Sequence, residues 1–143
     1  MYDETGGRHL TKSFMSCIKS CELTIDACQK LINSCAADNL EECAAQTGVC
    51  IANCRETSAT AAQCAEKSEA HGKACRNPTC REMMMEAAEA ARAADKTCQE
   101  AIQACKQGAS EHVSLILACI QACNDCAQAG QKCVDVPFSE CCP

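Results

Sequence analysis

The sequence predicts an all-α protein, an antiparallel up-down four-helix bundle with a cysteine-lined lumen, as a single domain over residues 1–143 with short flexible termini. Helix-favouring residues dominate the chain, and runs of β-branched residues are absent. Only three prolines occur in the 143 residues, and the few breaks divide the chain into four long segments. Helices joined by connections this short pack as antiparallel neighbours.

Capping signals mark the expected helix boundaries. Asn39 is a suitable N-cap, and Asn77 followed by Pro78 is typical of a cap with proline in the first helical position. Gly108 is expected to end the third helix, and Ser110 is expected to cap the fourth. The predicted helices therefore span about 11–36, 40–75, 78–107 and 110–135, with boundaries uncertain by a few residues.

The first two segments carry cysteines on the face expected to point inward, because residues spaced three and four apart share one side of a helix. In the first segment, cysteines alternate with aliphatic residues along Phe14, Ile18, Cys21, Ile25, Cys28, Ile32 and Cys35, with Cys17 beside them. In the second segment every cysteine falls on one stripe, formed by Cys43, Thr47, Cys50, Cys54, Thr57, Ala61, Cys64, Ser68, His71 and Cys75.

The last two segments repeat this pattern. The third stripe is rich in alanine and comprises Cys80, Met84, Ala87, Ala91, Ala94, Cys98, Ala101 and Cys105. The fourth comprises His112, Ile116, Cys119, Cys123, Cys126, Gly130 and Cys133. Of the 18 cysteines, only Cys141 and Cys142 lie away from these stripes. A core of Cys, Ala, Ser and Thr buries little apolar area, so cysteine acting as an ordinary hydrophobic residue explains the pattern poorly.

Two explanations for the cysteines stay open. An even number of cysteines is compatible with a disulfide-stapled extracellular bundle that has a structural or interaction role. However, pairs such as Cys50/Cys54 and Cys119/Cys123 are four residues apart on one helix, which suits chelation better than a covalent bridge. Thiolate is a soft ligand that selects Cu(I), zinc or iron–sulfur clusters, and thiols strung out along four helices favour a column of low-coordinate Cu(I) sites.

The candidate ligands for several Cu(I) ions are the cysteines on the stripes together with one thioether and two imidazoles. They are Cys17, Cys21, Cys28, Cys35, Cys43, Cys50, Cys54, Cys64, Cys75, Cys80, Cys98, Cys105, Cys119, Cys123, Cys126, Cys133, Met84, His71 and His112. Met84 and His71 lie near one end of the predicted bundle, and His112 lies near the other. The softer mixed set of ligands at the Met84 end favours that end as the metal entrance.

The run Cys119-Ile120-Gln121-Ala122-Cys123-Asn124-Asp125-Cys126 resembles the C-x3-C-x2-C runs of bacterial copper storage proteins, and the C-x3-C element recurs at residues 17–21 and 50–54. The resemblance implies a four-helix bundle that stores many Cu(I) ions in a cysteine-lined lumen, in a family with both cytosolic and exported members. One departure is Gly130, which stands where the motif would offer a further cysteine.

Composition excludes other classes of function. A net charge of −6 and only three aromatic residues argue against nucleic-acid binding. No stretch of 18 apolar residues is present, so no membrane span is expected. No nucleophile–base motif is recognisable, so an enzyme is not expected. The expected partners are copper ions with a copper chaperone or small thiol carrier, and possible self-association into a homo-oligomer. The expected location is cytoplasmic, with export after signal-peptide removal as the alternative.

Overall fold

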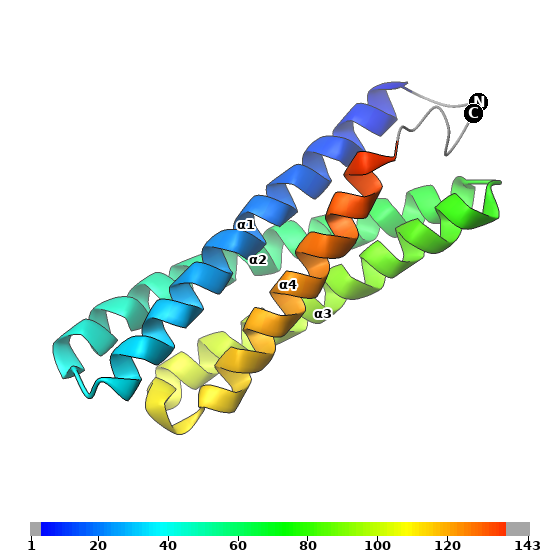
Figure 1. Cartoon of the computed structure of the whole chain (residues 1–143). Coiled ribbons are helices and arrows are strands. Elements are labelled where there is room, and N and C mark those ends of the chain that lie inside the picture. The colour runs from blue at the N-terminus through cyan, green and yellow to red at the C-terminus, as the bar shows by residue number, and fades with distance from the viewer. Residues whose placement is uncertain (1–3, 137–143) are drawn as a thin grey trace.

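The computed structural model describes residues 4–136 and is an all-α bundle of four long helices, as the sequence predicts (Figure 1). The helices are α1 (Glu4–Ala36), α2 (Leu40–Ala74), α3 (Pro78–Gly108) and α4 (Val113–Asp135). Each of α1 and α3 packs against both α2 and α4, so the helices follow one another around a central lumen. The connections α1–α2 and α3–α4 lie at what we call the two-turn end, and the α2–α3 connection lies at the one-turn end.

The capping residues predicted from the sequence set the starts of α2 and α3. The side chain of Asn39 accepts a hydrogen bond of 3.0 Å from the backbone N–H of Glu42. The side chain of Asn77 accepts hydrogen bonds from the backbone N–H groups of Thr79 and Cys80. These contacts satisfy N–H groups that have no partner within the helix, and they confirm both predicted caps.

Two helix starts differ from the expected boundaries. Helix α1 begins at Glu4 instead of near residue 11, and Leu10 in this added stretch is buried in the core with only 3% of its surface exposed. Helix α4 begins at Val113 instead of at residue 110. Gly108 ends α3 with a φ of 126°, which glycine tolerates, and Ala109–Glu111 then form a short 3₁₀ helix instead of the first turn of α4.

The inward face of α1 is also rotated relative to the expected one. Thr24 and Leu31 are fully buried, whereas Ile18, Ile25 and Ile32 are only partly buried at the edge of the core. Both sets repeat every seven residues, and they lie one position apart, or about 100° around the helix. The isoleucines therefore flank the core, and the polar Thr24 lies within it.

Two glycines permit close contacts between helices at the one-turn end. A Cβ atom at Gly130 in α4 would lie 3.2 Å from Cγ1 of Ile18 and 3.7 Å from Cδ1 of Phe14 in α1. A Cβ atom at Gly72 in α2 would lie 3.2 Å from Cβ of Met84 in α3. The space that a cysteine at position 130 would need is therefore filled by α1, which explains the glycine in place of the motif's next thiol.

Candidate metal centre

The cysteines of the predicted stripes line the lumen as buried free thiols. Fully or nearly buried are Cys17, Cys21, Cys28, Cys50, Cys54, Cys64, Cys98, Cys105, Cys119, Cys123, Cys126 and Cys133. Cys35 and Cys43 are also free thiols, but both are only half-buried. Cys80 is buried and disulfide-bonded, so it is not one of the free thiols. Cys141 and Cys142 lie outside the described residues. Because these lumenal thiols are reduced, stapling by disulfides across the lumen does not account for them.

One group of three thiols joins α1 to α4. The sulfur atoms of Cys17, Cys21 and Cys126 all lie within 4.8 Å of one another, and those of Cys17 and Cys126 are 3.5 Å apart. An ion bound equally by three sulfurs at about 2.3 Å, the length of a zinc–thiolate bond, needs sulfurs about 4 Å apart. The triad therefore needs only small movements to hold a metal ion.

Two further triads share one thiol. Cys28, Cys50 and Cys54 form one triad, with 3.2 Å between the sulfurs of Cys28 and Cys50. Cys54 also forms a triad with Cys98 and Cys119, whose sulfurs are 3.6 Å apart. All members of both triads are buried. Together they bring all four helices to one region of the lumen, so that Cys54 can contribute to two adjacent metal sites.

The triads belong to one continuous row of thiols. Cys119 is close enough to Cys28 to raise the pKa of the Cys28 thiol, which connects the two triads that share Cys54. The sulfur of Cys123 lies 3.8 Å from that of Cys98. Hydrogen bonding with Cys123 also raises the pKa of Cys21, which belongs to the triad with Cys17 and Cys126. We call this row the thiol chain; it comprises Cys105, Cys50, Cys28, Cys54, Cys119, Cys98, Cys123, Cys21, Cys126, Cys17 and Cys64.

A pair of buried hydroxyl groups interrupts the cysteines of α1 and α2 in mid-bundle. The hydroxyl oxygens of Thr24 and Thr57 are 2.7 Å apart, and both residues are fully buried. Thr24 separates Cys21 from Cys28 along α1, and across this region the thiol chain continues through Cys123 of α4. The sequence placed Thr57 on the inward stripe but gave no sign that Thr24 would be its partner.

Proximity of the thiols shifts their pKa values in opposite directions. Hydrogen bonds from Cys17 and Cys21 lower the pKa of Cys126 to about 5, because they stabilise its thiolate. The pKa of Cys21 is correspondingly raised, by hydrogen bonding with Cys123, Cys126 and Cys17 and by burial. In this triad the thiolate of Cys126 is thus favoured, while Cys21 keeps its proton. Binding of a metal ion by all three sulfurs must therefore release protons.

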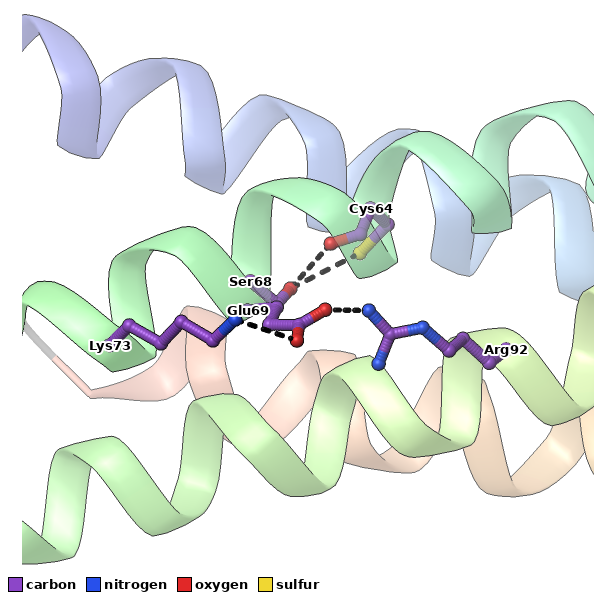
Figure 2. A network of polar contacts seen from close by, with 5 residues as sticks. All are labelled: Cys64, Ser68, Glu69, Lys73 and Arg92. Atoms are coloured by element: carbon purple, nitrogen blue, oxygen red, sulfur yellow. Dashed lines mark hydrogen bonds and ion pairs between the residues drawn. The ribbon is translucent and has the colours of Figure 1, made fainter.

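At the one-turn end the thiol chain meets a buried hydroxyl group. The hydroxyl of Ser68 donates a hydrogen bond of 2.6 Å to the carbonyl oxygen of Cys64 and lies 3.8 Å from its sulfur (Figure 2). On the outer side of this contact, Glu69 pairs with Lys73 at 3.1 Å and with Arg92 of α3, which ties α2 to α3 (Figure 2).

The remaining candidate ligands lie at the ends of the bundle. At the one-turn end, Met84 and Cys75 are buried and His71 is partly buried, and burial lowers the pKa of its imidazole. Also at this end, the Cys133 thiol donates a hydrogen bond of 3.8 Å to the carbonyl oxygen of Met83. His112 occupies the N-cap position of α4 at the two-turn end and makes no side-chain capping bond. The metal triads contain none of these residues.

Comparisons with protein-family models, curated proteins and solved structures find no match to this chain. Within residues 4–136, every helix is too short or too polar to cross a membrane. What the chain can do must therefore be argued from the lumen itself, whose buried thiol triads are positioned to hold metal ions.

Proposed function

We propose that this protein stores or sequesters several Cu(I) ions through cysteine thiolates in the lumen of the bundle. The observation that carries the proposal is the thiol chain, which contains three buried triads with sulfurs within 4.8 Å of one another. Each group has three sulfurs, whereas structural zinc sites almost always have four ligands. Soft sulfur ligands in sets of three favour Cu(I).

The charge balance of the lumen supports a monovalent ion. The buried polar residues of the described chain are Ser20, Thr24, Ser34, Thr57 and Ser68, and none of them is charged. Thiolates alone must then balance any cation held in the lumen. If thiolates such as Cys54 bridge neighbouring ions, one Cu(I) per thiolate leaves the interior neutral, which avoids the large cost of an unpaired buried charge.

The resemblance of residues 119–126 to copper storage proteins agrees with this proposal, because Cys119, Cys123 and Cys126 all lie in the thiol chain. We propose a copper chaperone or a small thiol carrier as the donor of Cu(I), with the cytoplasm as the site of storage. A reducing compartment keeps the lumenal thiols available as ligands.

Anaerobic titration of the reduced protein with Cu(I), in competition with a chromophoric chelator, tests the proposal. Saturation is expected at no fewer ions than the three triads, and Zn(II) is expected to compete poorly. Saturation at a single Cu(I), or preferential binding of Zn(II), would refute the storage function.

Two matched variants test whether the triads hold the metal. Cys54→Ser removes the sulfur shared by two triads, whereas Cys133→Ser removes a buried thiol that belongs to none. The Cys54→Ser variant is expected to lose more Cu(I) capacity than Cys133→Ser, although each loses one thiol. Equal losses would show that the triads are not the binding unit.

A further inference from the structure

Among the free thiols of residues 4–136, two are partly exposed to solvent, and they lie together. Cys35 is in the last turn of α1 and Cys43 is in the first turns of α2, and their sulfurs are 2.8 Å apart. Both are half-buried, whereas each of the free thiols in the lumen is at most 7% exposed. A metal ion arriving from solvent therefore meets this pair before it meets the lumenal thiols.

The connection between α1 and α2 holds the pair in place. The backbone N–H of Asp38 donates to the carbonyl oxygen of Cys35 at 3.2 Å, and the N–H of Asn39 donates to that of Ser34 at 3.3 Å. Asp38 adopts a positive φ of 56°, a conformation that aspartate tolerates better than most residues. Asn39 then caps α2. The two thiols are thus presented by an ordered turn.

Cys105 is a member of the thiol chain in the last turn of α3, at the same two-turn end of the bundle as the exposed pair. Burial, the hydrogen bond with Cys43 and the charge of Cys105 raise the pKa of Cys35 to about 11. Hydrogen bonding with Cys50 is in turn the largest cause of a raised pKa at Cys105, which is 7% exposed. Cys50 lies 3.2 Å from Cys28, and both belong to the triad that they form with Cys54. Successive thiols therefore lead from the solvent-facing pair to the lumen.

The opposite end offers no comparable route among the described residues. Phe14 and Met84 are each 1% exposed and Leu10 is 3% exposed there. Ser68 next to Cys64 is fully buried (Figure 2), and Cys75 and Cys133 at this end are only 3% and 0% exposed, so none of these groups meets solvent. This burial argues against the metal entrance that the sequence led us to expect at the Met84 end.

We propose that Cys35 and Cys43 form the transfer site at which a thiol-bearing donor hands Cu(I) to this protein, with Cys105 as the next ligand on the way inward. This inference rests on the proposed storage function. Transfer is a ligand exchange: a Cu–S bond to the donor breaks as a bond to Cys35 or Cys43 forms. The incoming thiol releases its proton to solvent, the donor sulfur leaves as a thiolate that can take up a proton, and copper stays in the Cu(I) state.

The first test is chemical labelling of the reduced, metal-free protein with limiting maleimide under native conditions, followed by peptide mass mapping. Among the cysteines in the described part of the chain, Cys35 and Cys43 are expected to be modified first. Modification of lumenal thiols at the same rate would overturn the proposal, because the pair would then have no privileged access. This result does not depend on any metal binding.

The second test measures the rate of Cu(I) transfer from its glutathione complex to the wild type, to Cys35→Ser/Cys43→Ser and to Ala36→Ser/Ala44→Ser. The two alanines are exposed neighbours of the cysteines in the same turns, so this control adds hydroxyl groups without removing thiols. The cysteine variant is expected to load roughly tenfold or more slowly, which corresponds to about 1.4 kcal/mol in the barrier. The control is expected to load at the wild-type rate.

The outcomes separate this inference from the proposed function. If the wild type takes up no Cu(I), the storage function itself fails, whatever the labelling shows. If the wild type and the cysteine variant both load fully and at the same rate, the storage function stands and the transfer site is refuted. Slow loading of the variant to nearly full capacity supports both, and circular dichroism confirms that the variant is folded.

Discussion

The buried hydroxyl pair gives the sharpest test of the core, and it requires no metal. Thr57→Val removes one hydroxyl and leaves that of Thr24 buried without its partner at 2.7 Å. An unsatisfied buried hydroxyl costs about 1–3 kcal/mol. For a protein of roughly this size, each kcal/mol lowers the melting temperature by about 2–4 °C. We therefore expect Thr57→Val to lower it by about 2–12 °C, and Thr24→Val to have a similar effect.

The double variant Thr24→Val/Thr57→Val distinguishes a paired contact from two independent ones. Replacing both hydroxyls leaves no buried group unsatisfied, so the double variant is expected to be less destabilised than the sum of the single variants. Thr47→Val is the matched control in α2, because the Thr47 hydroxyl donates to the carbonyl of Cys43 within the same helix. Thermal unfolding gives the melting temperatures and urea unfolding gives the free energies of all four variants, both followed by circular dichroism on the reduced apo protein. Strictly additive effects of the two valines would refute the contact.

Three further outcomes are expected. Gly130→Ala should destabilise the fold, because its Cβ would lie 3.2 Å from Ile18. Gly48→Ala meets nothing within 4 Å and should stabilise α2 by up to about 1 kcal/mol. The midpoints of urea unfolding measure both effects, and equal effects of the two variants would contradict the close packing at Gly130. Burial raises the pKa of Cys133 to about 12, so between about pH 9 and that value the unfolded chain binds fewer protons than the folded one. The free energy of unfolding, measured in urea at a series of pH values, should therefore fall as the pH rises above about 9, and it should fall less steeply in Cys133→Ser. A free energy of unfolding that does not change above about pH 9 would contradict this prediction. Copper loading should raise the melting temperature, since a ligand at 100 times its Kd that binds only the folded state adds about 2.7 kcal/mol; scans with and without a Cu(I) chelator measure it, and identical curves would argue against lumenal binding.

Helical spacing was enough to predict most of the lumen. In α3 every residue of the predicted stripe is buried, from Cys80 to Cys105, because alanine, cysteine and one methionine are the apolar residues that recur at helical spacing on that face. The cap at Asn39 was equally predictable, since it depends on hydrogen bonds within a few residues. Local periodicity and local capping are properties that a single helix shows without its neighbours.

The inward face of α1 was predicted wrongly because a contact with a neighbouring helix determines it. Ile25 is more apolar than Thr24, so its stripe was preferred, but the hydroxyl of Thr57 across the lumen satisfies Thr24. Which end admits metal stays a prediction, and the proposal of the Cys35/Cys43 end rests on the partial exposure of these two thiols in the assembled bundle. Contacts between helices and solvent exposure are set by the assembled bundle, so the one-dimensional pattern did not contain them.

The position of Cys54 in two triads at once has a consequence for how the lumen fills. Two ions held on either side of one sulfur are bridged by it, so they form a polynuclear cluster instead of two isolated mononuclear sites. A first ion would order the shared ligand, and a second would then bind to a partly assembled site. Loading of this region should accordingly be cooperative, with few molecules holding a single ion there at intermediate copper concentrations.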